Sequence, residues 1–404
     1  MSTRRKFVKE VAASAALASS AKAQKGTYDV VVVGAGVFGA WTAHHLRKAG
    51  KRVLLVDAYG ASNSRASSGG ESRIIRCGYG PDEIYTRFSK ESLSQWQDLS
   101  RRTTNPLFHK TGVLWFGKST DSRITATVET LTKHKVPHEK LSQRELEKRF
   151  PQFFFGDAGA GVLEPDSGAL MARRSVQTLV QEMTANGVEM LIEPVLPPSA
   201  KGKLASITTA SKRTISAGTF VFACGPWLPK VFPQELGSRI FPTRQEMFFF
   251  GSAPGDRRFA APNMPCWIDV GDIYGVPDLE NRGMKLANDQ HGPAFDPDSS
   301  DRIVTKEGLD AIRKALAHRF PAMKNAPLVE SRVCQYENTS NGDFLLDRHP
   351  AAENVWFAGG GSGHGFKHGP AVGEYVAGRI LGTRKEEPRF TFASKGTVQK
   401  RSVY

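Results

Sequence analysis

The chain has 404 residues, 40% of them hydrophobic, so it can bury a large core in two domains or in one domain with an insertion. It carries a net charge of +15, but no dense Lys/Arg run interleaved with aromatic residues and no zinc-finger spacing. This pattern disfavours nucleic acid and metal as ligands and favours an anionic small molecule or an envelope surface. Because no run of 18 apolar residues occurs, we expect no membrane-spanning segment.

The N-terminal segment has the parts of an export signal in the right order. Arg4 and Arg5 are adjacent, an alanine-rich apolar stretch follows, and A-K-A closes the segment at 21–23. The arginine pair resembles a twin-arginine signal, so we expect residues 1–23 to engage the twin-arginine export machinery and the mature protein to be periplasmic or otherwise extracytoplasmic. A basic, helical N-terminal tail is the alternative. The segment contributes +4 to the charge, which leaves the mature chain at about +11.

A strand, a turn, a helix and a second strand are predicted next. Residues 30–33 are four consecutive valines, which is typical of a strand buried on both faces. The helix is expected from about 38 to 49 and ends at Gly50. A second buried strand at 53–56 ends in Asp57. This order predicts one βαβ unit.

The turn of this unit carries the motif G-x-G-x-x-G at Gly34, Gly36 and Gly39. The first glycine allows the tight turn, the second lets the backbone approach a pyrophosphate, and the third permits close packing of the helix. Asp57, about 20 residues on, is expected to hold a ribose hydroxyl. The motif alone does not separate NAD from FAD, but its place at the start of the mature chain favours a flavin.

Two further units, each a strand followed by glycines, occur at 218–227 and 354–374, and a helix is expected to begin near Pro370. The predicted fold is therefore α/β, with a discontinuous Rossmann-like FAD-binding domain and an inserted, mainly antiparallel substrate domain of α+β type. The FAD-binding domain is expected at 27–110, 160–235 and 341–385, the substrate domain at 111–159 and 236–340, and a C-terminal tail at 386–404.

Several ordered segments of the chain resemble the monomeric sarcosine oxidase and N-methyl-amino-acid oxidase group of the D-amino-acid-oxidase superfamily. The resemblance runs from about residue 28 to about 385. Its most specific segments are G-E-S-R-I-I-R-C-G-Y-G at 70–80, T-G-V-L-W-F-G at 111–117, E-P-D-S-G at 164–168, Y-G-V-P at 274–277, G-M-K-L at 283–286, V-C-Q-Y at 333–336 and G-S-G-H-G-F-K at 361–367.

This resemblance implies roles for four cationic residues. Arg76 and Lys367 would bind a substrate carboxylate, since a guanidinium fork matches a carboxylate and an ammonium adds a point charge. Arg73 would lie beside the flavin ring. Lys285 would lie near the flavin N5 and promote the reaction with O2. Without the resemblance, solvent-facing side chains would be the ordinary interpretation of these residues.

The resemblance also implies the remaining contacts of substrate and cofactor. Tyr274 and Tyr336 would line the substrate pocket, although core packing is the alternative. The cofactor residues are expected to be the glycine motif, Asp57, Gly225, Gly361 and Gly363. His364 lies between glycines and is either a flavin contact or a turn residue.

Four cysteines occur, at Cys77, Cys224, Cys266 and Cys334, with irregular spacing that does not suggest a disulfide framework. Isolated cysteines are most often small buried hydrophobes, which is our expectation for the first three. Cys334 matches the family cysteine that is bonded through sulfur to the flavin 8α carbon, so the resemblance implies covalent FAD.

Two positions depart from the family pattern. Asp289 and Gly69 each stand where sarcosine oxidase has a histidine, which puts sarcosine itself in doubt as the substrate. The sequence predicts an FAD-dependent oxidase of a secondary, N-methyl or cyclic, amino acid that uses O2, makes hydrogen peroxide, needs no metal and is a monomer. A dehydrogenase with a respiratory acceptor and a non-catalytic flavin-binding protein are the alternatives.

Overall fold

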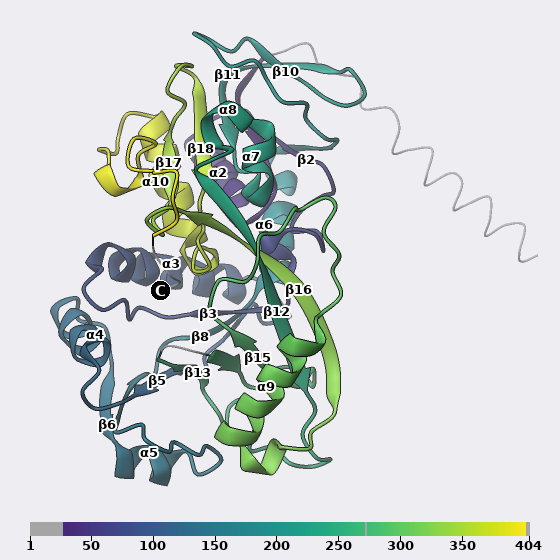
Figure 1. The fold of residues 1–404 in the computed structure, drawn as a ribbon. Coiled ribbons are helices and arrows are strands. Elements are labelled where there is room, and N and C mark those ends of the chain that lie inside the picture. Colours follow the sequence, from purple (N-terminus) through teal and green to yellow (C-terminus); the bar gives the residue numbers. More distant parts are fainter. Residues whose placement is uncertain (1–26, 271–272, 401–404) are drawn as a thin grey trace, which may run out of the picture.

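The computed structural model describes residues 27–270 and 273–400, and the expected export signal lies outside them. Figure 1 shows two sheets stacked along the long axis of the molecule, with the long strands β12 (Ile240–Phe250) and β16 (Leu328–Thr339) in the second sheet reaching toward the first. Within the described residues, no helix is both long and apolar enough to cross a membrane.

The first sheet contains the predicted βαβ unit. β1 lies between β2 and β11 in parallel register, with Val31 opposite both Leu54 and Phe220. β9 and β18 continue the parallel sheet, and β17 pairs antiparallel with β18 at one edge. Strands far apart in the sequence therefore share one sheet, as predicted. Its members are β17 (Leu345–Arg348), β18 (Val355–Gly359), β11 (Thr214–Phe222), β1 (Tyr28–Val33), β2 (Val53–Asp57), β9 (Glu189–Ile192) and β10 (Ser206–Thr208).

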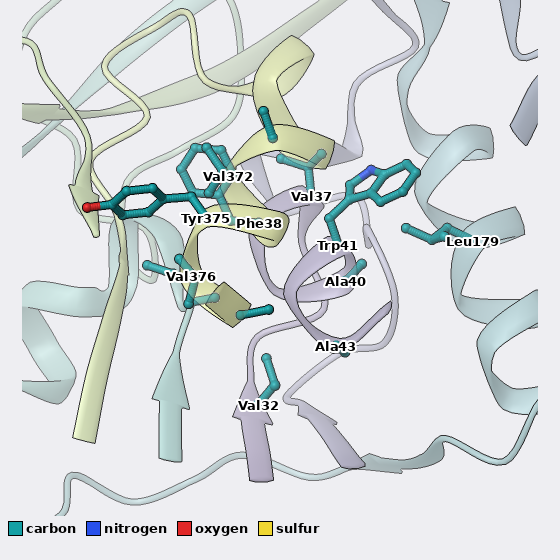
Figure 2. Close-up of a cluster of buried hydrophobic side chains, with 14 of the residues drawn as sticks. Val32, Val37, Phe38, Ala40, Trp41, Ala43, Leu179, Val372, Tyr375 and Val376 are labelled. Carbon is teal, nitrogen blue, oxygen red and sulfur yellow. The ribbon is translucent and has the colours of Figure 1, made fainter. Parts of the chain in front are cut away.

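Helices cover both faces of this sheet, which explains its continuous valine and leucine runs. On one face, α2 packs closely against α10, and Figure 2 shows Trp41 and Phe38 of α2 beside Val372 and Val376 of α10. A side chain at Gly373 would place its Cβ 2.4 Å from the Trp41 carbonyl carbon, so this approach requires glycine. The helices here are α2 (Val37–Lys48), α3 (Glu83–Arg101), α6 (Ala172–Ala185) and α10 (Gly369–Ile380), with α7 (Leu228–Val231) and α8 (Pro233–Leu236) on the opposite face.

The second sheet is mainly antiparallel, as predicted for the inserted domain. Its order is β16-β12-β15-β14-β13-β5-β7-β6, and the pairing of β5 with β13 is its one parallel pair among the described strands. One face packs on α9 through residues such as Phe248, Phe250 and Leu286. The other elements are β15 (Met284–Asn288), β14 (Ile273–Val276), β13 (Cys266–Asp269), β5 (Val113–Gly117), β7 (Ala160–Glu164), β6 (Glu139–Ser142), α4 (Ser122–Lys133), α5 (Gln143–Arg149) and α9 (Lys306–Arg319).

One expected boundary differs from the observed sheets. β7 begins at residue 160, which we assigned to the FAD-binding domain, yet it pairs with β5 and β6 in the second sheet. After β7 the chain passes through β8 of a small third sheet before it returns to the first sheet. The third sheet is formed by β3 (Ser72–Ile75), β8 (Gly168–Met171) and β4 (Phe108–His109). Single turns of 3-10 helix complete the fold at η1 (Ser67–Gly69), η2 (Gly225–Trp227), η3 (Pro321–Met323), η4 (Phe366–His368) and η5 (Pro388–Phe390).

Candidate active site

The glycine turn after β1 is shaped by close backbone contacts. Gly34 has φ +106°, and a Cβ on it would lie 2.2 Å from the Ala223 carbonyl oxygen at the end of β11. A Cβ on Gly39 would lie 1.8 Å from the Gly34 carbonyl oxygen. Gly36, at the N-terminus of α2, has no such contact and instead lines a cavity. The three glycines therefore serve the turn, the opening and the helix packing that the motif predicts.

The cavity has a volume of about 350 Å³ and lies where the parallel strands of the first sheet end. In parallel sheets this is the usual place for a nucleotide. Most residues predicted to hold the cofactor line it, from both halves of the fold. They are Gly34, Gly36, Asp57, Gly225, Gly361, Gly363 and Cys334, joined by Arg73 and Tyr336.

Asp57 makes hydrogen bonds within the protein that the sequence pattern did not predict. Its Oδ2 accepts a hydrogen bond of 2.7 Å from the Ala35 N–H within the glycine turn, and its Oδ1 accepts from Tyr59 N and Gly60 N. Burial raises the pKa of the carboxyl, and these backbone donors oppose the rise. The carboxylate thus fastens the turn as well as lining the cavity.

His364 lies outside the cavity lining, and its ring contacts protein groups. Its Nδ1 is 3.2 Å from the Tyr79 hydroxyl, and its Nε2 is 3.2 Å from the Gly342 carbonyl oxygen. Its own carbonyl accepts a hydrogen bond from Lys367 Nζ. These contacts favour the turn residue over the flavin contact, the two interpretations of His364 that the sequence leaves open.

The inner face of the second sheet, opposite the face that packs on α9, carries most of the predicted chemistry. Strand register explains how: Cys334 pairs with Gln245, Phe249 with Lys285, and Ala287 with Tyr274. Since paired residues share a face and the side-chain period is two, Cys334, Tyr336, Lys285 and Tyr274 fall on one surface. Residues that are 60 apart in sequence meet there because β12 lies between β15 and β16.

Cys334 is a free thiol, 7% exposed, and lies beside a cation. Its Sγ is 3.5 Å from Arg73 Nη2, and the same guanidinium donates to the carbonyl oxygens of Ser67 and Ser72. Cys224 also lines the cavity, but its thiol faces the Val33 carbonyl and burial raises its pKa. Cys77 and Cys266 are buried, and burial raises the pKa of both thiols.

Lys285 is buried, with 1% of its surface exposed. Its Nζ donates a 3.0 Å hydrogen bond to the Ser72 carbonyl oxygen and lies 5.4 Å from the centre of the Tyr274 ring. Burial, and next the charge of Arg73, lower the pKa of Lys285 to about 7. A small change in the charge around Lys285 can therefore switch its protonation near neutral pH.

Arg76 and Lys367 come together around a residue that the sequence did not single out, Tyr79. The guanidinium carbon of Arg76 lies 4.2 Å from the ring centres of both Tyr79 and Trp115. Lys367 Nζ donates to the Tyr79 hydroxyl at 2.9 Å. Burial and the charge of Arg76 hold the pKa of Lys367 well below its usual range. Two buried cations sharing one phenol form a strong attractor for an anion.

Glu164, in the E-P-D-S-G segment, fixes the loop that carries Arg76. Its Oε2 accepts from Cys77 N at 2.7 Å and from the Ser167 hydroxyl at 2.8 Å. Its Oε1 accepts from Gly78 N at 3.0 Å and from the Trp115 indole at 3.3 Å. The segment was recognised as part of the resemblance, but a buried acid that binds backbone groups leaves no other signal in sequence.

The two departures from the family pattern differ in their surroundings. A Cβ on Gly69 would lie 1.9 Å from the Asn63 carbonyl oxygen, so no larger residue fits this backbone. Asp289 follows β15 and accepts a 3.2 Å hydrogen bond from the Tyr336 hydroxyl. Burial raises the pKa of its carboxyl to about 6, while Arg76, Tyr336, Lys367 and Lys285 oppose that rise.

Comparison with known proteins agrees with this geometry. A model of the family of FAD dependent oxidoreductases, DAO, matches residues 29–379. The chain belongs to this family. The site fits the cofactor that the family name implies, because the cavity combines glycine-lined backbone, a helix N-terminus and residues from the second sheet.

Individual relatives cover most of this FAD dependent oxidoreductase. Human peroxisomal sarcosine oxidase is 30% identical over 88% of this chain and 92% of its own, and monomeric sarcosine oxidase of Bacillus sp. (strain NS-129) is 31% identical over 89% and 94%. N-methyl-L-tryptophan oxidase of Salmonella newport is 28% identical over 88% and 95%. In fold, the chain is similar to L-proline dehydrogenase from P. horikoshii, with a TM-score of 0.78, 21% identity, and coverage of 91% and 98%.

Replacing Gly34 by Ala should abolish stable flavin binding, because the new Cβ would overlap the Ala223 carbonyl and strain a positive φ. Gly50→Ala is the matched control: it also has a positive φ (+81°) but nothing within 4 Å of its Cβ. Flavin absorbance per protein in the purified variants measures the effect. Equal flavin content in the two variants would contradict this account of the turn.

Proposed function

We propose that the protein is an FAD-dependent amine oxidase whose substrate is a secondary amino acid, N-methylated or cyclic. The observation that carries the proposal is the pair of buried cations, Arg76 and Lys367, held on Tyr79. Lys285, on the inner face of the second sheet, lies in the same region, because its charge and those of Arg76 and Lys367 all lower the pKa of Asp289. The names of the sarcosine oxidase and N-methyl-L-tryptophan oxidase relatives support this class of substrate.

The protein groups would divide the work between holding the cofactor and holding the amino acid. Gly34, Gly36 and the N-terminus of α2 would receive the pyrophosphate. When bound, FAD would supply at N5 the acceptor for a hydride from the carbon beside the substrate nitrogen; water would hydrolyse the imine product, and the electrons would pass to O2 to give hydrogen peroxide. Arg76 and Lys367 would bind the substrate carboxylate.

The inner sheet face would complete the pocket. Tyr274 and Tyr336 would exclude water from the substrate, and burial raises the pKa of both phenols, so they stay neutral. Arg73 would contribute a fixed positive charge beside the cofactor, since its guanidinium is already held by two carbonyl oxygens. Lys285 would supply a second positive charge where O2 is reduced.

We extend the proposal to the setting in which the enzyme works. Residues 1–23 would direct folded, FAD-loaded protein through the twin-arginine machinery to an extracytoplasmic site, where it acts as a monomer. A covalent bond from Cys334 to the flavin fits this route, because a cofactor fastened before export cannot be lost outside the cell.

A peroxide assay on purified holoprotein tests the function. Amino acids of the N-methyl and cyclic classes should bleach the flavin without oxygen and yield hydrogen peroxide with it. Bleaching that is followed by turnover only when an artificial electron acceptor is added would favour a dehydrogenase with a respiratory acceptor. A panel that bleaches nothing would favour a non-catalytic flavoprotein.

Replacing Arg76 by Ala should raise KM for the amino acid by tens- to hundreds-fold, about 2–3 kcal/mol, because a charge-assisted contact to the carboxylate is lost. An amine of the same size without the carboxylate should be affected much less. Steady-state rates with the two substrates measure this difference. Equal losses for both would mean that Arg76 supports the fold rather than the carboxylate.

Lys285→Met should slow the reaction of reduced enzyme with O2 far more than it slows reduction by substrate, because the superoxide anion forming there loses a positive charge. In the wild type, this rate should fall as pH rises through the pKa of Lys285, about 7 or higher once an anion is bound beside it. In the variant this pH dependence should vanish. Stopped-flow oxidation that is unchanged by the substitution would exclude the role; Lys306→Met, on an exposed lysine, is the control.

Cys334→Ser should release flavin into the supernatant on acid precipitation, whereas wild-type protein should keep its colour in the pellet and exceed the polypeptide mass by one FAD. A thiolate is the nucleophile for such a bond, and a hydroxyl is far weaker. Cys224→Ser is the control, since that thiol also lines the cavity. Wild-type flavin that washes out in acid would refute covalent attachment.

A further inference from the structure

Asp289 lies among the groups proposed to bind the substrate, yet the proposed function gives it no task. It follows β15, four residues after Lys285, and is partly exposed to solvent. Within the described part of the chain, the Tyr336 hydroxyl, 3.2 Å from Oδ1, is its hydrogen-bond donor, and Oδ2 receives none. One carboxylate oxygen is therefore available to a ligand.

The groups that surround Asp289 come from every element packed around it. Arg76, which follows β3, Lys367 from η4 and Lys285 from β15 oppose the rise in the pKa of Asp289. The phenols of Tyr79, Tyr274 and Tyr336 face it as well, since its charge raises the pKa of all three. The ring of His291 lies beyond, against Gln399.

Glu164, a second acid of this region, cannot take the same role. Its two oxygens already accept four hydrogen bonds, from Cys77 N, Gly78 N, the Ser167 hydroxyl and the Trp115 indole. A carboxylate that is fully used in this way has no capacity for a cation from outside. Asp289 differs from Glu164 because it is more exposed and because its Oδ2 accepts no hydrogen bond from the described residues.

An amino acid presents two charges, and the site so far accounts for one. Arg76 and Lys367 would take the carboxylate, which leaves the substrate ammonium facing a region of three cations. An ammonium placed there without an anion would be repelled by these positive charges. Its oxidation also requires the nitrogen lone pair, so the ammonium must lose a proton first.

We propose that Asp289 binds the substrate ammonium through Oδ2 and accepts its proton, which delivers the neutral amine to the cofactor. The inference rests on the proposed function. One N–H bond of the substrate breaks, one O–H bond forms on Asp289, and the electron pair stays on nitrogen. Tyr336 holds Oδ1 and thereby orients the other oxygen toward the substrate.

The electrostatics of the carboxyl suit a base that works near neutral pH. Its pKa, raised to about 6 by burial, leaves it ionised at pH 7 and able to take a proton. Below about pH 6 it is protonated and cannot accept another, so the step should be lost as pH falls. Because the pKa lies close to the working pH, the proton can also be released again after the reaction.

Anaerobic stopped-flow reduction of the holoenzyme over about pH 5 to 10 tests the proposal, with Asp289→Asn as the variant. Wild-type reduction should be nearly constant above neutral pH and fall below about pH 6. The variant should be slower by about 100-fold at pH 7 and should recover as pH approaches the pKa of the substrate ammonium. Asn288→Ala, on the exposed neighbour, should leave the wild-type profile in place.

Two further measurements separate a base from a structural role. Asp289→Ala should regain rate when formate is added, because a free carboxylate can occupy the vacated space. A carboxylic acid with carbon in place of nitrogen should bind Asp289→Asn at least as tightly as it binds wild type, as measured by flavin absorbance. A variant slowed equally at all pH values and not restored by formate would overturn the proposal. Failure of every amine to reduce wild type would instead refute the proposed function.

Discussion

Burial of positive charge is the constraint on which this site depends. Arg76, Lys285 and Lys367 are each at least 94% buried, and such groups are costly without partners. The protein offsets the cost with aromatic faces and carbonyl oxygens: Tyr79 and Trp115 for Arg76, the Ser72 carbonyl for Lys285, and the Tyr79 hydroxyl for Lys367. The lowered pKa values of both lysines show that the offset is incomplete. An anionic ligand would complete it, which would link binding to stability.

The two sheets contribute different kinds of precision to this arrangement. In the first sheet, backbone segments of the site are in direct contact, as Gly34 is with Ala223. Even one added side-chain carbon would therefore clash there. The second sheet sets side chains by register, so that β12 fixes the distance between Lys285 on one neighbour and Cys334 on the other. The first sheet therefore suits a cofactor of constant shape. In the second sheet, side chains can be exchanged while the strands keep their positions.

Sequence reasoning found the parts of the fold that depend on local pattern. The valine run of β1, the glycine motif and the helix at 37–48 follow directly from periodicity and turn chemistry. It assigned β7 to the FAD-binding domain rather than to the second sheet. The run is short and buried throughout, so its sequence does not show which sheet it joins. Sequence reasoning also missed Tyr79 and Glu164, since a residue that positions another differs in no visible way from one that packs the core. The sequence pointed to Asp57 and His364, but their hydrogen-bond partners follow only from the tertiary structure.

The placement of Asp289 explains how residue 289 can change without loss of the fold. Lys285 lies within β15, where its neighbours on β12 and β14 fix it, but Asp289 lies one residue beyond that strand. The segment that follows is held by Gln245 of β12, which bonds to the backbone of Gln290 and Gly292, and by Gln399 of the C-terminal tail, which contacts the His291 ring. None of these contacts involves the side chain of residue 289. The charge of the residue at position 289 can therefore change while β15 and the cavity of the first sheet keep their geometry.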